Sequence, residues 1–252
     1  MPNTIMQKVC LLALSIFTYS AVQTAHAESS FEQELQRGCQ AVSQHAALGK
    51  KLYDQKNYKK ALEHFQTQAA WSSFCLSNED ETMVKFTEQQ VITAQNNVAL
   101  SYAKMGKPMW ARAWLMINKE EKTNQFNLKN LAKPKISTDL SGEYVSYSGY
   151  GEWDHITVKR HKNAYEVSYA GLYMGLRSLI YGPNMGEFDT SFALNKKRAI
   201  YKYEDCTIQL DFKTDQNLGH YIEAKQESGE STCGFGHNVY AGGTFYKVEK
   251  SQ

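Results

Sequence analysis

Beyond its N-terminus the sequence lacks a long hydrophobic run, and it lacks a concentration of charge of one sign. No later apolar stretch reaches about 18 residues, the length that a transmembrane helix requires. The 28 Lys and Arg residues are balanced by 26 Asp and Glu residues, without a basic block. We therefore expect no transmembrane segment after the first 27 residues and no nucleic-acid partner.

The motifs of common enzyme classes are missing as well. The chain contains no Gly-x-Ser-x-Gly, no His-Glu-x-x-His and no Cys-x-x-Cys. After residue 27 no two histidines share ligand spacing on one expected helix or strand, so a metal site would need three histidines brought together by folding. Asp154 with His155, and His220 with Glu223, are read as solvated polar residues of strands. We expect no catalytic residue, no metal and no cofactor.

A single apolar run stands at the N-terminus. Lys8 is the only charged residue in the first 27, Val9–Ala21 is apolar, and Ala25-His26-Ala27 fits a signal-peptidase site. This pattern predicts a signal peptide over residues 1–27, and a mature chain of 225 residues (252 − 27) that is periplasmic or secreted. One alternative is a short membrane anchor. A lipoprotein is disfavoured, because Cys10 lies inside the apolar run and no cysteine directly follows the cleavage site.

Four cysteines follow the expected cleavage site: Cys39, Cys75, Cys206 and Cys233. An even number in an exported chain predicts two disulfides, and three pairings are possible. We favour Cys39–Cys75 with Cys206–Cys233, because each bridge then stays within one candidate domain. The alternative is free buried thiols.

Residues 28–131 have the periodicity of helices. Apolar residues recur at spacings of three and four, a polar turn occupies 54–57, and Gly106-Lys107-Pro108 breaks a later helical stretch. Residues 119–137 are polar and are expected to be a helix end followed by a linker at 132–137. The first apolar stripe consists of Phe31, Leu35, Cys39, Val42, Ala46, Gly49 and Tyr53.

This region resembles tetratricopeptide repeats. The first match is Leu48, Gly49, Tyr58, Ala61 and Phe65, and the second is Asn97, Val98, Ala99, Tyr102, Gly106 and Ala111. The resemblance implies an inner groove in which Lys50, Tyr53, Asn97 and Lys104 contact an extended peptide. The spacing of 50 residues departs from the usual 34 or so, and residues 72–88 look like an insertion. Two repeats are few for a solenoid, so we expect the helices to lean on the second domain or a partner; an ordinary helical bundle is the alternative.

From residue 138 to 252 the period changes to two, which predicts an antiparallel β-barrel or sandwich. On strand 206–212, Ile208, Leu210 and Phe212 share a face with Cys206 and should point inward. The fold class is thus α+β, with helical hairpins preceding a β-domain of about eight strands. The expected strands are 143–147, 156–160, 165–169, 188–194, 199–203, 206–212, 220–224 and 239–247.

Residues 171–186 interrupt this pattern with an apolar, Gly-rich stretch. We expect a flap or a short helix over the barrel mouth. Twelve of the sixteen tyrosines lie between Tyr144 and Tyr246, which suits either half-buried strands or a recognition surface. Tyr173, Met174, Leu179 and Tyr181 are the candidate ligand or partner residues of this segment.

The β-domain also has a closing motif. Ser141-Gly142-Glu143-Tyr144, the stretch from Cys206 to Phe212, and the Cys233-Gly234-Phe235-Gly236 turn resemble a small β-domain of exported bacterial proteins that occurs beside lysozyme-inhibitor domains. The resemblance implies the fold and the Cys206–Cys233 disulfide, and it places no inhibitory loop on a residue here.

Together these observations predict an exported, non-enzymatic binding or scaffold protein that recognises a protein or peptide partner in the cell envelope. One alternative is a small apolar ligand held in the β-domain. Another is inhibition of a cell-wall hydrolase such as lysozyme, which rests on the closing motif alone.

Overall fold

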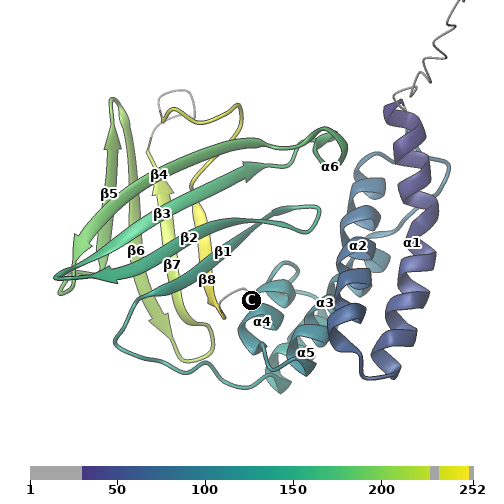
Figure 1. Ribbon diagram of the computed structural model, residues 1–252, viewed down its shortest axis with the longest axis horizontal. Helices are drawn as coiled ribbons and strands as arrows, with labels where there is room; N and C mark the ends of the chain where they lie inside the picture. The colour runs from purple at the N-terminus through teal and green to yellow at the C-terminus, as the bar shows by residue number, and fades with distance from the viewer. Residues whose placement is uncertain (1–29, 228–232, 250–252) are drawn as a thin grey trace, which may run out of the picture.

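The computed structural model describes residues 30–227 and 233–249, so the predicted signal peptide lies outside the described residues. Helices come first and an antiparallel sheet follows, which confirms the predicted α+β class (Figure 1). The helices are α1 (Phe31–Asp54), α2 (Tyr58–Ser77), α3 (Glu88–Lys104), α4 (Pro108–Met116), α5 (Lys122–Asn130) and the short α6 (Ser178–Tyr181). The strands are β1 (Gly142–Gly149), β2 (Glu152–His161), β3 (Ala164–Tyr173), β4 (Asn184–Ala193), β5 (Arg198–Tyr203), β6 (Cys206–Asp215), β7 (Gly219–Gln226) and β8 (Gly243–Val248).

Local chemistry fixes where the helices begin. Ser30 and Thr87 form capping boxes at the starts of α1 and α3, each accepting a hydrogen bond from the backbone N–H three residues on. Pro108 opens α4 at a position where the missing N–H is not needed. Gly106, with φ +75, makes the preceding left-handed turn that a residue with a Cβ adopts only with strain.

Several boundaries differ from the sequence expectation, and β3 and β4 extend into the expected flap, to Tyr173 and from Asn184. Helix α2 continues through Ser77, because Phe74 and Cys75 are fully buried there; only 78–87 of the expected insertion is non-helical. Residues 122–130 form a separate helix, α5, rather than a helix end and linker. The last strand begins at Gly243, whereas 239–242 have no regular structure.

Polar side chains hold α5 in place, which explains why an apolar pattern did not reveal it. Asn124 is 1 % exposed; its amide nitrogen donates to the carbonyl of Leu115 at 2.9 Å. Its amide oxygen accepts a hydrogen bond from Asn96 at 2.6 Å, and Asn127 donates to Asn96 at 2.7 Å. Satisfied amides of this kind can be buried at little net cost.

The eight strands form one sheet in the order β4-β3-β2-β1-β8-β7-β6-β5, which curls into a nearly closed barrel. The edge strands β4 and β5 meet: Thr190 Oγ1 donates to the carbonyl of Ile200 at 2.8 Å, and the rings of Phe188 and Tyr201 stack at 4.6 Å. As predicted, the inward face of β6 is buried. The barrel interior is filled by side chains that include Tyr144, Ile156, Tyr169, Phe188, Ile208, Leu210, Phe212, Ile222 and Phe245.

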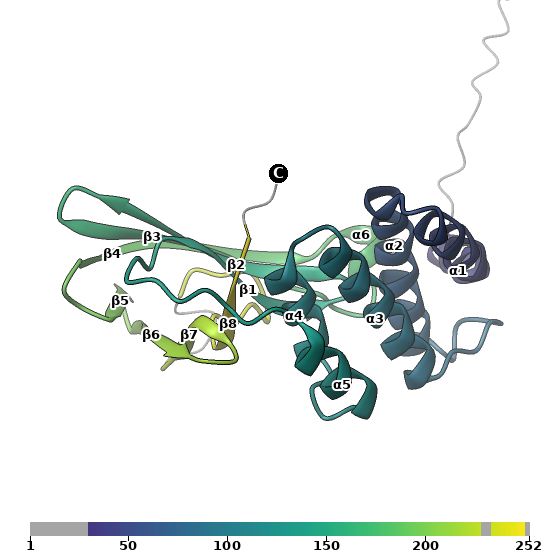
Figure 2. The ribbon, with the colours of Figure 1, turned by 90° about the horizontal axis from the view of Figure 1, so that it is seen from below.

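The helices pack against the outside of the barrel. Figure 2 shows α4 beside β1 and β8, with α3 and α5 next to α4. Trp153 of β2 contacts Trp110 edge-on at 5.8 Å and Trp114 edge-on at 5.4 Å, and Val145 and Val248 belong to the same buried cluster. The two parts therefore share one apolar core.

Glu249 adds a polar latch to this interface. Its carboxylate accepts hydrogen bonds from the backbone N–H groups of Met109 and Trp110, at 2.9 and 3.0 Å. Its carbonyl accepts the indole N–H of Trp110 at 2.8 Å. A carboxylate at the N-terminus of α4 satisfies orphan donors and the helix dipole together.

Both favoured disulfides are formed: Cys39–Cys75 and Cys206–Cys233. Their presence indicates a location outside the reducing cytoplasm. Within residues 30–227 and 233–249, no helix combines the length and hydrophobicity that crossing a bilayer requires.

Removal of the Trp153 ring, at the interface between the helices and the barrel, tests whether the two parts share one core. We expect Trp153→Ala, at a site 7 % exposed, to lower the free energy of unfolding by about 3–5 kcal/mol, because the cavity forms between two tryptophans. Urea unfolding followed by circular dichroism measures the change. The control is Phe126→Ala, 66 % exposed on α5, which should shift stability by no more than about 0.5 kcal/mol. Equal stabilities for the two variants would contradict the shared core.

Candidate functional site

Two adjoining cavities run along the first three helices, and we call them together the helical groove. One has a volume of about 670 Å³ and the other about 630 Å³. They share the lining residues Ser43, Ala46, Gln68 and Thr93, so they form one continuous surface. A groove that runs beside three helices suits an extended chain better than a compact molecule.

Each helix contributes one face to the helical groove. On α2, Phe65, Gln68 and Ser72 follow one another at three and four residues, the spacing of a single helix face. The same spacing places a face of α1 and a face of α3 along the cavities. The α1 residues are Gln40, Ser43, Ala47, Lys50 and Asp54, and the α3 residues are Gln90, Thr93, Asn97 and Leu100.

Gln68 carries the most informative feature of the helical groove. Its side chain is 9 % exposed and lines both cavities, where they meet. Its amide oxygen is buried and has no hydrogen-bond partner among the described residues. A buried acceptor without a donor costs about 1–3 kcal/mol, so a ligand that supplies an N–H at this point would recover that free energy.

Three of the four predicted groove residues lie together. Lys50, Tyr53 and Asn97 line the cavity of about 630 Å³. Lys104 is exposed at the end of α3 and lines neither cavity. Lys50 donates to Asp54 at 2.7 Å in an exposed ion pair, so its charge is already balanced. Lys104 therefore lies apart from the other three predicted residues.

The remaining chemistry of the helical groove is neutral. Burial, with Tyr58 and Asp54 nearby, raises the pKa of Tyr53 above its ordinary value, so this phenol keeps its proton. Besides the Lys50–Asp54 pair, the charged lining residue is Lys85, whose ammonium donates to the carbonyl of Glu79. Amides, hydroxyls and apolar side chains make up the rest, a lining that suits an uncharged segment.

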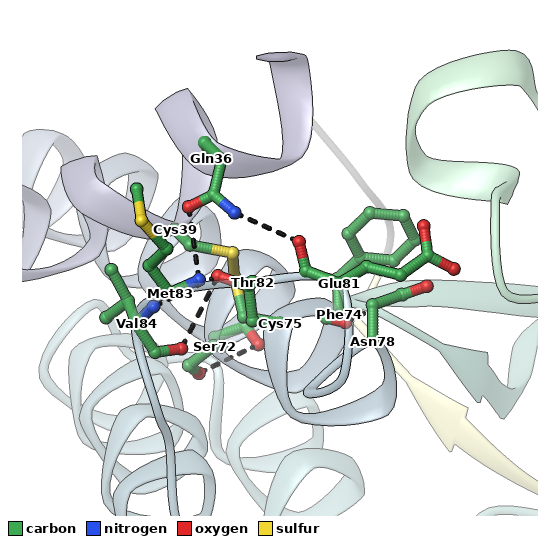
Figure 3. The surroundings of a disulfide bond; sticks show 11 residues. Gln36, Cys39, Ser72, Phe74, Cys75, Asn78, Glu81, Thr82, Met83 and Val84 are labelled. Atoms are coloured by element: carbon green, nitrogen blue, oxygen red, sulfur yellow. Dashed lines mark hydrogen bonds between the residues drawn. A yellow bond between two sulfur atoms is a disulfide. The ribbon is translucent and has the colours of Figure 1, made fainter. Parts of the chain in front are cut away.

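A loop at residues 78–87 walls one end of the helical groove with Val84, Lys85, Phe86 and Thr87. Figure 3 shows how α1 holds this loop. The amide of Gln36 donates to the carbonyl of Glu81 at 2.9 Å and accepts from the N–H of Met83 at 3.2 Å. The Cys39–Cys75 disulfide joins α1 to α2 beside it (Figure 3).

The predicted flap is arranged differently from the expectation. Its short helix, α6, is present, but Met174, Leu179 and Ile180 pack on a cluster that contains Phe31 and Phe74. Figure 1 shows α6 beside α1 and α2, so this segment does not cover the barrel. Tyr173 is 38 % and Tyr181 64 % exposed, and these two candidate residues remain accessible.

Folding also brings together two histidines that the sequence leaves apart. His45 of α1 and His64 of α2 approach to 3.1 Å between their Nδ1 atoms, which requires one ring to donate and the other to accept. Burial, and then the nearby His64, lower the pKa of His45. No group of three or more His, Cys, Asp or Glu able to hold a metal is present in the parts of the chain that the structure describes.

The prediction that Asp154 and His220 are solvated strand residues is wrong: they are only 8 % and 5 % exposed, and both have hydrogen-bond partners within the fold. His155 pairs with Glu143 at 2.9 Å, while the carboxylate of Asp154 accepts hydrogen bonds from Ser148 and from the N–H of Leu172. His220 contacts the carbonyl of Ser137 at 2.8 Å. Burial raises the pKa of Asp154, and burial lowers the pKa of His220.

Comparisons with protein-family models, with curated proteins and with solved structures give no match to this chain. Its function therefore has to be argued from the groove and the surfaces themselves.

Removal of the disulfide beside the helical groove should weaken the helices. We expect Cys39→Ser with Cys75→Ser to lower the free energy of unfolding by about 2–4 kcal/mol, because the unfolded chain is no longer cross-linked. Thermal unfolding of oxidised protein measures the loss. A control compares two proteins that both carry Cys206→Ser and Cys233→Ser. A reductant should lower the stability of the one that retains Cys39 and Cys75 to that of the one in which both are serine. A variant as stable as oxidised wild type would refute the expectation.

Acidification should destabilise the α1–α2 hairpin. The folded state holds the pKa of His45 below 6.5, so the unfolded chain binds more protons as the pH falls through that value, and stability falls with it. Urea unfolding at about pH 7.5 and about pH 5.5 tests this. His45→Gln should lose less stability between these conditions than wild type, whereas His161→Gln, on an exposed residue paired with Glu166, should lose as much as wild type. Identical losses in all three proteins would contradict the role of the histidine pair.

Proposed function

We propose that this chain is an exported, non-enzymatic binding protein that holds an extended, uncharged peptide segment of a cell-envelope protein in the helical groove. The observation that carries the proposal is the orphan amide oxygen of Gln68, where the two cavities meet. An extended peptide offers backbone N–H donors at regular intervals, and one of them would complete this acceptor.

The composition of the helical groove supports binding over chemistry. Its side chains are mainly amides, hydroxyls and apolar groups, which donate, accept and pack without supplying a nucleophile beside a base. Gln40 and Asn97 among them carry amides that can pair with both the N–H and the C=O of a peptide backbone. The tetratricopeptide-like spacing favours the same occupant.

Localisation to the periplasm or the extracellular medium is part of the proposal. The apolar N-terminal run and the two disulfides support it. An envelope partner follows, because an exported binding protein meets its ligands in the compartment where it folds and oxidises.

A second exposed surface supports a scaffold role. Around α6 and the start of β4, the large apolar side chains of Leu176, Tyr181 and Met185 are 62 %, 64 % and 57 % exposed. Exposed apolar and tyrosine-rich patches of this kind occur at protein contacts. We propose this surface, which we call the α6 patch, as a second point of contact for a protein partner.

The two alternative functions have less support. The barrel interior is filled by the protein's own aromatic and aliphatic side chains, which favours the helical groove over the barrel as a binding site. Inhibition of a cell-wall hydrolase stays a prediction that rests on the closing motif.

Peptide selection followed by affinity measurement tests the proposal. Peptides of exported proteins would be selected on the purified, oxidised protein, and the dissociation constants of the best binders measured by fluorescence polarisation. We expect Gln68→Leu to weaken binding about tenfold, because the peptide N–H loses its acceptor in a buried place. Ser43→Trp should abolish binding, because the indole fills the shared part of the two cavities.

Two matched variants separate the helical groove from other surfaces. Gln125→Met changes an exposed glutamine of α5, and Tyr181→Ala changes the α6 patch; both should leave the affinity for the selected peptides unchanged. Selected peptides that bind Ser43→Trp as tightly as wild type would overturn the proposed groove.

A further inference from the structure

A third cavity lies where the helices meet the barrel, away from the helical groove. Its volume is about 420 Å³. Helices α4 and α5, the segment that follows α5 and the turn between β6 and β7 all contribute to its wall. The lining residues are Arg112, Met116, Leu128, Lys129, Leu131, Lys133, Asn217 and Leu218, and they include three cationic side chains and no acidic one.

Arg112 is the unusual member of this set. Its side chain comes from α4 and is 5 % exposed. One terminal nitrogen donates to the carbonyl of Ala132 at 3.2 Å, but Nε is buried without a partner. No ion pair of Arg112 with an acidic residue occurs within residues 30–227 and 233–249. Burial lowers the pKa of its guanidinium.

Burial of the Arg112 guanidinium without an ion-pair partner is unfavourable for the stability of the unliganded protein. A buried charge is ordinarily paired with an opposite charge, because the loss of hydration is not otherwise repaid. An arginine guanidinium presents its N–H groups as a planar fork that matches the oxygens of a carboxylate or a phosphate. Arg112 lines the cavity, and so do the exposed side chains of Lys129 and Lys133.

The adjoining surface increases the positive potential. A neighbouring cavity of about 390 Å³ shares Lys133 and adds Lys135 and Lys247. Its acidic lining residue, Glu249, is already engaged by the N-terminus of α4. Asp139, near Lys247, accepts hydrogen bonds from Ser141 and Tyr165. Basic side chains thus concentrate around residues 129–135 in a chain whose formal net charge is only +2.

We propose that the cavity at Arg112 is a binding site for a phosphate group, with Arg112 as its buried anchor and Lys129 and Lys133 at its entrance. A tetrahedral oxyanion suits a cavity lined by one guanidinium and two ammonium groups, and it would supply the acceptor that Nε lacks. The group can belong to free inorganic phosphate or to a phosphate ester such as a lipid headgroup.

The first test compares unfolding with and without phosphate. Wild type, Arg112→Met and Arg198→Met would be heated in chloride buffer and in inorganic phosphate at equal ionic strength. We expect phosphate at about 100 times its dissociation constant to raise the Tm of wild type by roughly 5–10 °C. Arg198→Met, which changes an exposed arginine of β5 paired with Asp211, should gain as much. Arg112→Met should gain nothing.

The chloride arm separates a ligand site from a purely structural arginine. Without phosphate, Arg112→Met should be at least as stable as wild type, because methionine fills similar space without a buried charge. A large loss of stability in Arg112→Met together with no response of wild type to phosphate would overturn the proposal. An equal response of all three proteins would overturn it too, because it would report a general effect of the anion.

The source of the phosphate group is resolved by calorimetric titration of wild type with inorganic phosphate, with glycerol phosphate and with vesicles containing phosphatidylglycerol. Binding of inorganic phosphate alone identifies a site for the free anion, and binding of glycerol phosphate or the vesicles identifies a site for esters; each is expected to disappear in Arg112→Met. Heats that persist unchanged in Arg112→Met would place the binding elsewhere and reject this cavity.

Discussion

The fold depends on indole rings that are buried between α4 and β2. Their burial removes from water an apolar face of the helices and an apolar face of the barrel, and neither part could cover its own face alone. Trp153 on the outside of the barrel contacts both Trp110 and Trp114. Tyr102 of α3 stacks on Trp110, with 5.5 Å between the ring centroids. A short stack of helices ordinarily needs further repeats to close its ends. Here the barrel provides that closing surface, and the helical groove on the other helices stays open.

The helical groove owes its shape to contacts that lie outside it. The disulfide and the Gln36 amide hold α1, α2 and the 78–87 loop in register, while Asn96, Asn124 and Asn127 fix α5 on the far side of α3. These are directional contacts, in contrast to the apolar barrel interior. A binding surface held by such contacts is arranged before a ligand arrives, which reduces the ordering that binding requires.

The sequence revealed the parts of the fold that follow from simple periodicity. Strand β6 alternates, so its inward face could be assigned, and Pro108 and the turn after Asp54 mark helix boundaries. Helix α5 was missed because its buried residue is an asparagine, and such a residue is indistinguishable from a solvated one until its partners are known. Gln68 and Arg112 were missed for the same reason: each is polar in sequence and becomes informative through burial. Lys104 is the opposite case. Its predicted contact with a peptide required it to line the groove, but it is exposed at the end of α3 and lines neither cavity.

The latch at Glu249 has a consequence for the order in which the molecule matures. The carboxylate that completes the N-terminus of α4 stands 140 residues after Met109, and β8 also comes late in the chain. A nascent or partly exported chain that has not yet delivered these residues leaves α4 uncapped and its tryptophans uncovered. The helices therefore reach their finished state only after the barrel has closed on them, and until then their exposed indoles would be recognised by chaperones that bind apolar segments. Loss of β8 and Glu249 would thus first destabilise α4, which comes much earlier in the chain.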